Sequence, residues 1–508
     1  MQATESDYPT PPELHVAAWN ALSQEATDIT PRLIVHIDRA SQQTQSLPKR
    51  AVGQRNDFYR RACWAPDGSA LLAVTESQQT HTYRCQRSCA SDASVHGDLL
   101  ELQMKRKGPS PLLDAIWYPV PAVQHLTDND QIHVPTLTSE PIWCFAESHR
   151  DLPIRLTASH DGRCRASYSI MNHVEKFVGP HSLVFSPDLS RIYCGLDSAL
   201  AVFPLSLPGL NTHAFIPLIQ AKRSAGGQRG IVSALAAAAD PSQPTQELVA
   251  VGTFSGTVAI YSFNPAEFPE PVEHNAVHVS TSDGQQCLAQ RSCLAGWREI
   301  EGEGLTQLRF HPLTPYVLFV ASRRSDYIYV YDIRYLMGDT LRWNFRPLAQ
   351  ASGGVRTGPL LAKLRRPGAA SHQRLHFDVD WAGRWLVTGD EMGMIHLWRI
   401  DVGRFVDQAD VDKMDNSQGI ELMPDLSWKA HQDSVGSVAL HPHEPWLASV
   451  SGSRHWPDAD SAHSSESGSE SDKSSDRGGA GSSRRAWTTK EDSLKVWDFS
   501  EPWRRCAG

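Results

Sequence analysis

Seven basic residues near the ends of predicted strands are the side chains best suited to chemistry in this 508-residue chain. Guanidinium and ammonium groups neutralise phosphates, and guanidinium planes stack on unpaired bases, which is the chemistry of binding single-stranded RNA. A single surface arginine is more often only a solvated charge. The set gains functional meaning if the fold brings its members to one rim, as the starts of neighbouring strands can do. The candidates are Arg150, Lys222, Arg223, Arg229, Arg323, Arg324 and Arg374.

Motifs for catalysis or metal binding are missing from the sequence. It contains no P-loop, no Gly-x-Ser-x-Gly elbow and no His-Glu-x-x-His. His274 and His278 have the spacing of metal ligands, but they lie in a predicted loop without a third ligand. Cys85 and Cys89 lack the two-residue gap of zinc knuckles. We therefore expect a binding protein that is not an enzyme and that uses no cofactor or metal.

Composition narrows the class of protein further. A chain of 508 residues with 40% hydrophobic side chains can bury a large core. Its formal net charge of −9 means that nucleic acid would have to bind at a local basic patch. No apolar run approaches the roughly 18 residues that cross a bilayer, and the acidic start lacks the apolar core of a secretory signal. We therefore expect no membrane partner. Nine cysteines without a secretory signal indicate a reducing compartment.

One stretch, residues 172–203, contains the complete pattern of a repeating unit. Its first apolar strand is predicted at 181–185. Ser186-Pro187-Asp188 then forms a turn, because proline fixes φ and aspartate bonds the turn backbone. Two further strands are predicted at 191–194 and 199–203. Strand, Ser-Pro-Asp turn, strand, tight turn and strand is the pattern of one blade of a WD-repeat propeller.

Six further stretches repeat this pattern. The last of them ends in Trp497-Asp498, the one complete Trp-Asp pair of the chain. The units exceed the usual ~40–45 residues because loops are inserted in them. The predicted fold is all-β: a seven-bladed WD-repeat β-propeller with long loop insertions, spanning 51–508. The six stretches are 56–84, 112–157, 230–263, 305–333, 374–400 and 434–498.

Composition also predicts what lies outside the blades. Residues 1–50 are expected to be a mostly disordered tail, except for a candidate strand at 31–37 that would close the ring by adding to the last blade. Residues 264–304 lack periodicity, and 457–485 contain no large apolar side chain, so both are predicted to be disordered insertions. Ser467 and Ser469 have acidic residues three positions on, which suits an acid-directed kinase. The interpretation of this serine-rich stretch as only a solvated spacer is equally well supported.

Five residues are candidates for structural roles between or within blades. Buried polar groups must be paired, so His181 and Asp378 are expected to make hydrogen bonds from blade to blade. His431 either does the same or lies exposed in its loop. Trp497 and Asp498 end the last unit. The basic run 105–107 is either a nuclear import element or a basic loop.

Several segments outside the ordinary repeat pattern match one known family. The most specific are Arg150-Asp151-Leu152-Pro153-Ile154, Arg165-Ala166-Ser167-Tyr168 with Asn172-His173, and His181-Ser182-Leu183 with Phe185-Ser186-Pro187 and Cys194-Gly195. Others are Asp57-Phe58 with Cys63-Trp64-Ala65-Pro66-Asp67-Gly68, Gln373-Arg374 with Phe377-Asp378, and Leu440-His441-Pro442 with Ser451-Gly452 and Arg454. In these the chain resembles the telomerase Cajal body protein family of WD-repeat proteins. The short Pro-rich start and the stretch 264–304 depart from the family and suggest a fungal or other divergent member.

The resemblance implies a function that the residues alone do not specify. Members of the family bind small nuclear RNAs of the H/ACA class, telomerase RNA among them in animals, and direct them to Cajal bodies without catalysis. It implies H/ACA RNA, its core proteins and telomerase or spliceosomal components as partners. It also implies a nuclear location, with the cytoplasm as a second compartment. The alternative is a protein-interaction scaffold without RNA contact, either linked to snRNA and pre-mRNA splicing factors or of the G-protein β-like kind.

Overall fold

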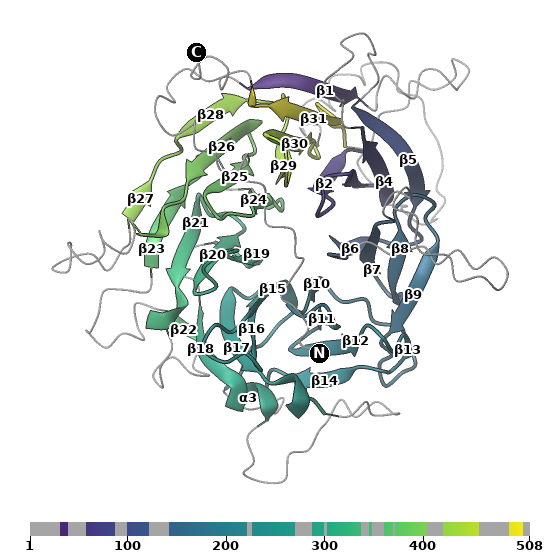
Figure 1. Ribbon diagram of the computed structural model, residues 1–508, viewed down its shortest axis with the longest axis vertical. Coiled ribbons are helices and arrows are strands. Elements are labelled where there is room, and N and C mark those ends of the chain that lie inside the picture. The colour runs from purple at the N-terminus through teal and green to yellow at the C-terminus, as the bar shows by residue number, and fades with distance from the viewer. Residues whose placement is uncertain are drawn as a thin grey trace, which may run out of the picture.

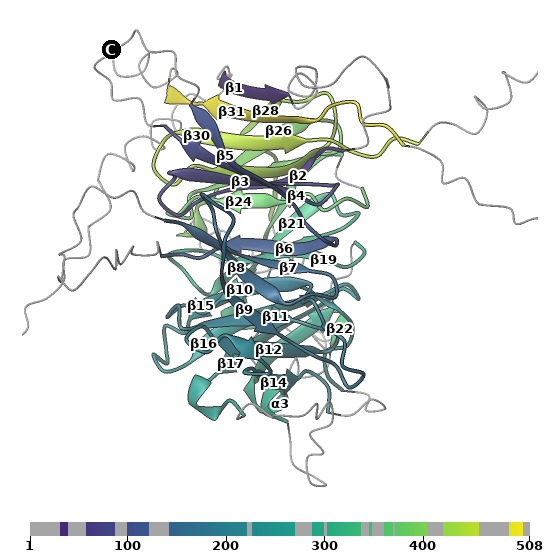
Figure 2. The same ribbon diagram turned by 90° about the vertical axis from the view of Figure 1, so that its right-hand side faces the viewer.

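A ring of seven antiparallel sheets surrounds a central axis, so the predicted β-propeller is confirmed (Figure 1). Figure 2 shows the ring from its side, with the strands of successive blades running across its thickness. None of the helices in the described part is long and apolar enough to cross a membrane. The computed structural model describes residues 31–38, 57–86, 99–120, 142–220, 226–269, 287–298, 302–336, 345–347, 360–368, 371–403, 420–456 and 487–500.

The first three blades follow one another along the chain, and in each the first strand lies nearest the axis (Figure 1). Blade one contains β2 (Tyr59–Trp64), β3 (Ala70–Thr75), β4 (Gln79–Cys85) and β5 (Leu100–Lys107). Blade two contains β6 (Leu112–Trp117), β7 (Cys144–His149), β8 (Ile154–Ala158) and β9 (Cys164–Ser169). Blade three contains β10 (Ser182–Phe185), β11 (Arg191–Gly195), β12 (Ala199–Pro204) and β14 (Ala214–Pro217).

The remaining blades continue the same order. Blade four contains β15 (Val232–Ala239), β16 (Glu247–Thr253), β17 (Thr257–Phe263) and β18 (Cys293–Arg298). Blade five contains β19 (Leu305–Phe310), β20 (Val317–Ser322), β21 (Tyr327–Asp332) and β23 (Leu360–Arg365). Blade six contains β24 (Phe377–Val379), β25 (Trp385–Gly389), β26 (Met394–Arg399) and β28 (Leu426–Lys429). Short helices are η2 (Pro265–Glu267), α3 (Leu288–Ser292) and η3 (Ile333–Tyr335).

The seventh blade joins the two ends of the chain. It contains β29 (Val435–Leu440), β30 (Trp446–Ser451), β31 (Ser493–Asp498) and β1 (Arg32–Asp38). β1 pairs antiparallel with β31, placing Arg32 opposite Asp498 and Asp38 opposite Ser493. β31 therefore lies between a strand from the start of the chain and one from its last quarter, and this pairing closes the ring.

Three blades carry a fifth strand that the sequence did not predict. β13 (Gly209–Leu210), β22 (Arg346–Pro347) and β27 (Ile420–Leu422) pair in parallel with the outer strands β9, β18 and β23. An outer strand has unpaired backbone groups that invite association with other chains. These short additions cover that edge in blades two, four and five.

Two predictions outside the inner strands need correction. The stretch 264–304 is not wholly a disordered insertion, because α3 and β18 lie inside it and β18 supplies the outer strand of blade four. Its short run Cys-Leu-Ala-Gly-Trp buries Ala295 and Trp297, but it is too brief to show a strand period. The basic run 105–107 is not a loop, since it ends β5. Ser467 and Ser469 lie outside the described residues.

Buried histidines join two pairs of neighbouring blades at the turns that follow the inner strands. His311, after β19, lies 3.0 Å through Nε2 from the carbonyl oxygen of Gly383, and His441, after β29, lies 3.1 Å from that of Gly68. Nδ1 of each ring accepts two backbone N–H groups of its own turn. The proton must therefore be on Nε2, which donates to the glycine carbonyl. Burial lowers the pKa of His311, which favours this neutral form.

We expect Gly383→Ala to destabilise the ring by about 1–3 kcal/mol, because it combines backbone strain with a lost hydrogen bond. Gly383 has a φ of +71°, and a Cβ there would lie 2.0 Å from Nε2 of His311. Urea unfolding measures the effect. The matched control is Gly162→Ala, where φ is +69° but the nearest atom, in Met104, is 3.4 Å away. Equal losses in the two variants would show that the histidine contact contributes nothing.

Candidate functional site

One face of the ring carries the starts of all seven inner strands and the turns between the second and third strands of each blade. This follows from the antiparallel order that the blades share. We call it the starting face. Arg150 follows β7, Arg229 precedes β15, Arg323 and Arg324 follow β20, and Arg374 precedes β24, so these five predicted residues lie on it. Lys222 and Arg223 lie outside the described residues.

Arg323 and Arg374 meet at one aromatic ring. Cζ of Arg323 lies 4.8 Å from the ring centroid of Phe254, and Cζ of Arg374 lies 5.4 Å from it. Phe254 belongs to the turn between β16 and β17, and the ring of His181, just before β10, approaches it edge-on at 6.5 Å. Four blades thus contribute one side chain each. We call His181, Phe254, Arg323 and Arg374 the Phe254 cluster.

The two guanidinium groups of this cluster have no acidic partner within the described part of the chain. Among the described residues, neither forms an ion pair within 4.0 Å, and Arg374 donates only a long hydrogen bond, 3.4 Å, to the carbonyl oxygen of Ser233. Nε of Arg323 is buried without a hydrogen-bond partner in this part of the chain. The nearby Glu303 instead pairs with Arg324 at 2.8 Å. Buried donors without an acceptor are uncommon, so this arrangement favours an acceptor from a ligand.

Two arginines of blade one, missed in the sequence analysis, lie beside the cluster. Arg60 and Arg61 are the second and third residues of strand β2. Arg60 pairs with Glu76 at 3.1 Å, and Arg61 pairs with Asp114. Burial, followed by the charges of Arg323, Arg60 and Arg61, lowers the pKa of Arg374 to about 10, while Asp114 opposes the change. Arg374 is therefore protonated at neutral pH. In the sequence, the adjacent pair Arg60-Arg61 at the start of an inner strand could have indicated that these residues contribute to the site.

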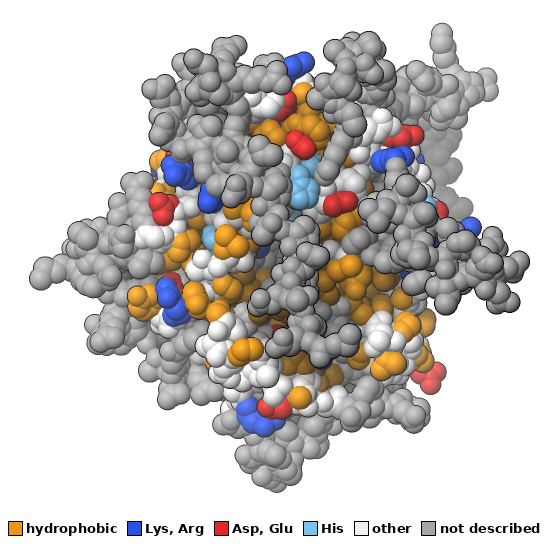
Figure 3. Space-filling view, in the orientation of Figure 1, with side chains coloured by type: hydrophobic (Ala, Val, Ile, Leu, Met, Phe, Trp, Pro, Cys, Tyr) orange, Lys and Arg blue, Asp and Glu red, His pale blue; other side chains and the backbone are white. Residues whose placement is uncertain are grey.

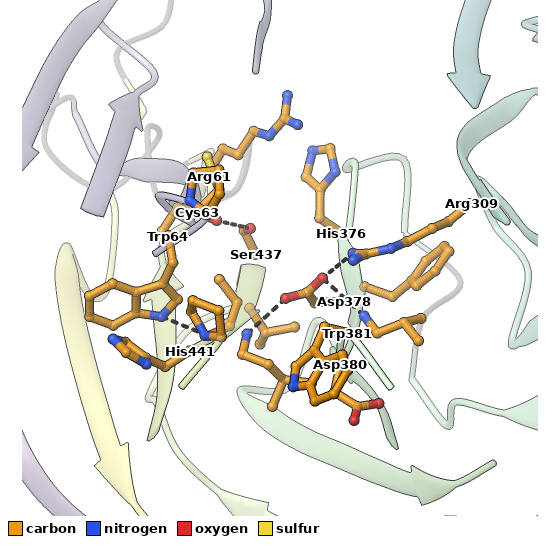
Figure 4. Close-up of a pocket in the computed structure, with 18 of the residues that line it drawn as sticks. Arg61, Cys63, Trp64, Arg309, His376, Asp378, Asp380, Trp381, Ser437 and His441 are labelled. Atoms are coloured by element: carbon orange, nitrogen blue, oxygen red, sulfur yellow. Dashed lines mark hydrogen bonds and ion pairs between the residues drawn. The ribbon is translucent and has the colours of Figure 1, made fainter. Parts of the chain in front are cut away.

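Two histidines at this end of the channel are held neutral by their surroundings. The pKa of His376 is well below its usual value because of burial and then the charges of Arg61, Arg374 and Arg60. Burial, Arg374 and Arg150 lower the pKa of His181, partly offset by Asp197. Figure 4 shows His376 and Arg61 extending toward the same side of the channel. Burial and the neighbouring arginines therefore disfavour a positive charge on either ring.

The central channel is hollow next to these residues. A cavity of about 530 Å³ is lined by Arg61, Arg374 and His376 together with apolar residues of blades two to five. A second cavity, of about 350 Å³, is shown in Figure 4 and extends between blades one, five, six and seven. The two cavities share Arg61, Gln307, Arg309 and His376, so the same polar side chains face both.

Carboxylates in the channel wall link three blades at a time. Asp378 of β24 accepts from the Arg309 guanidinium of β19 and, at 2.8 Å, from the backbone N–H of Leu440 in β29 (Figure 4). Asp114 of β6 likewise accepts from Arg61 of β2 and from the N–H of Leu183 in β10, also at 2.8 Å. Each carboxylate therefore holds its own blade to both neighbours.

The other structural candidates differ in their contacts. The predicted hydrogen bond of His181 is wrong: within the described residues its ring contacts Phe254 and has no hydrogen bond, since arginines and an aromatic ring surround it. His431 is buried, and its Nε2 lies 2.8 Å from the hydroxyl of Ser449, which also accepts from Trp497 Nε1 at 2.9 Å. Asp498 accepts from the amide and hydroxyl of Ser500, at 2.8 and 2.7 Å.

Comparisons with known proteins agree with this architecture. The family model "WD domain, G-beta repeat" matches residues 424–455. Telomerase Cajal body protein 1 of Rattus norvegicus is 27% identical over 80% of this chain and 60% of its own length. The Drosophila melanogaster homologue of that protein is 24% identical over 79% of this chain and 58% of its own. Guanine nucleotide-binding protein negative regulator 1 of Schizosaccharomyces pombe is 26% identical over 68% of this chain and 71% of its own.

The ring, its blade-to-blade contacts and the WD match define a WD-repeat β-propeller of the scaffold type. Over about four fifths of its length the chain is similar to proteins named telomerase Cajal body protein 1. It spans about three fifths of the length of its mammalian and insect relatives. A fungal origin stays a prediction.

Proposed function

We propose that this chain is a non-catalytic RNA-binding scaffold of nuclear ribonucleoproteins. Its ligands would be small RNAs of the H/ACA type, telomerase RNA among them in animal relatives, and its role would be to direct them to Cajal bodies. H/ACA core proteins and telomerase or spliceosomal components would be its protein partners. Support for the nuclear location comes from relatives whose names place them in Cajal bodies.

The observation that carries the proposal is the gathering of arginines on the starting face. Arg323 and Arg374 meet there without acidic partners among the described residues. Arg150 and Arg229 lie exposed on the same face. Cations gathered in a protein with a net charge of −9 form a local patch for an anionic ligand, and RNA phosphates are such anions.

Binding of labelled H/ACA RNA to the purified protein is expected to weaken steeply as salt rises. Each phosphate contact releases counterions, giving a slope of about −0.7 per contact for single strands in a plot of log affinity against log salt. Three to five contacts predict a slope of about −2 to −4. Crosslinking and RNA sequencing from cells identify the ligand. Recovery of neither H/ACA nor spliceosomal RNA above background would rule out this function.

A protein-interaction scaffold without RNA contact is the second candidate. Large apolar side chains are exposed opposite the starting face: Leu313 is 64% exposed, Leu207 54% and Val120 43%. Figure 3 shows hydrophobic side chains over one face of the ring, with Lys and Arg mainly toward its margin. The Schizosaccharomyces pombe relative is named as a regulator of a guanine nucleotide-binding protein. Salt-independent association with proteins, and no RNA association, would favour this reading.

A further inference from the structure

The geometry points to a phosphate-binding site at the mouth of the central channel: we propose that Arg323 and Arg374, held against Phe254, bind one phosphate group of a bound RNA strand. The inference rests on the proposed function and names the side chains that would contact the RNA backbone. The shared chemistry is that of anionic phosphate oxygens, which a free polyphosphate also offers.

Two like charges from different blades lie against the same aromatic ring. Arg323 comes from the turn after β20 and Arg374 from the chain before β24, yet both guanidinium groups lie within 5.4 Å of one ring centroid. The negative face of an aromatic ring attracts each cation and partly offsets their repulsion. An anion between or beside them would remove the rest of that repulsion. The orphaned Nε of Arg323 then gains an acceptor.

A phosphate fits this arrangement better than a base does. Two guanidinium groups already lie against the ring of Phe254 and would compete with a base for stacking on it. Guanidinium edges match the paired oxygens of a phosphate and bind them more strongly than neutral acceptors. Exposed Arg150 and Arg229 on the same face provide charges for further phosphates of a continuous strand. A phosphopeptide with a single phosphate would leave these unused.

Phosphate binding at this mouth is coupled to the uptake of a proton. His376 faces Arg60 and Arg61 from β2, Arg309 from β19, and Arg374 and Asp378 from its own segment. Cations and burial keep the pKa of His376 low, so the ring is neutral without ligand. An added phosphate offsets part of the local positive charge and so raises that pKa. Because the complex then holds more protons than the free protein, affinity must rise as pH falls.

The first test measures binding of labelled H/ACA RNA by fluorescence anisotropy at several salt concentrations. Arg323→Gln and Arg374→Gln are each expected to lower affinity about 5–50-fold and to reduce the salt slope by about 0.7. Arg399→Gln is the matched control, because this exposed arginine ends β26 on the opposite face, and its slope should equal the parent's. Phe254→Leu keeps every charge but removes the ring, and a loss of about 3–10-fold is expected if the ring positions both cations.

The second test compares pH 7.5 with pH 6.0. The parent should bind RNA more tightly at pH 6.0 than at pH 7.5, and His376→Gln should lose most of that gain. Melting temperatures of all variants establish that each is folded. Unchanged salt slopes in folded Arg323→Gln and Arg374→Gln proteins overturn the inference and leave the proposed function intact.

Melting temperatures measured with pyrophosphate test the phosphate site independently of the proposed RNA-binding function. If the parent binds no RNA at any salt, the proposed function fails. A rise in the parent's melting temperature with pyrophosphate that is absent in Arg374→Gln would then identify a site for free polyphosphate. No response to either ligand would exclude a phosphate site altogether. Equal binding of a phosphopeptide and RNA of matched charge would reassign the ligand class.

Discussion

Deletion of residues 494–498 is expected to abolish the cooperative unfolding transition of the ring. These residues form most of β31, which pairs with β30 on one side and with β1 on the other. Leu494 and Val496 are fully buried, and Trp497 donates to Ser449. Without β31 the last blade loses its third strand and β1 loses its only pairing in the described structure. Circular dichroism during heating measures the loss.

The control is deletion of 457–485, which should leave the ring folded. The ends of this insert are already fastened, because His455 and Thr488 exchange two backbone hydrogen bonds of 2.8 and 2.9 Å. The buried carboxylate of Asp433 accepts from Ser453 on one side of the insert and from the amide of Lys490 on the other. Shortening a flexible loop changes its closure entropy by only ~1–2 kcal/mol, in the stabilising direction. An unfolded insert deletion would show that 457–485 belongs to the folded blade.

Asp378→Ala is expected to destabilise the protein by about 2–4 kcal/mol. The change leaves the backbone N–H of Leu440 without its acceptor and the Arg309 guanidinium without its anion. Removing one partner from a buried pair costs about 3–5 kcal/mol. The Arg309 side chain is 37% exposed and can be rehydrated, so the expected value is somewhat lower. Chemical denaturation with urea gives the free energy of unfolding.

Two further variants separate the contributions of Asp378. Asp378→Asn keeps an acceptor for Leu440 but removes the charge, so it should lose less stability than Asp378→Ala. Asp161→Ala removes a carboxylate whose partners, His160 and Arg163, are exposed, and a change below about 1 kcal/mol is expected. If Asp378→Ala behaves like Asp161→Ala, the three-blade contact does not stabilise the ring.

The inner three strands of most blades could be predicted from the sequence because their turns are chemically explicit. Ser186-Pro187-Asp188 and the His-Pro pairs at His311 and His441 mark the turn after an inner strand. The outer strands are harder to predict from the sequence. The two-residue strands β13 and β22 are too short to show a period, and they are defined by parallel pairing with a neighbour. Their formation depends on the assembled blade rather than on local preference.

The candidate site was predictable in part. The positions of Arg323 and Arg374 at the start of turns and strands placed them on one face, since strand direction is fixed by the blade pattern. Phe254 and His376 carried no comparable signal, because a single aromatic or histidine has meaning only beside residues from other blades. Residues far apart in the sequence are brought together by ring closure, which no local pattern encodes.

The pairing of β1 with β31 also determines when, during synthesis of the chain, the ring can close. The two strands are separated by 455 residues, counting from Asp38 to Ser493. At about 5–20 residues per second, roughly 20–90 s pass between synthesis of the first and of the second. Throughout that interval β1 has no partner and the growing ring has an open edge. The cell therefore handles a ring with an exposed edge throughout that interval, and a chain that stops before residue 493 cannot form this closing pair.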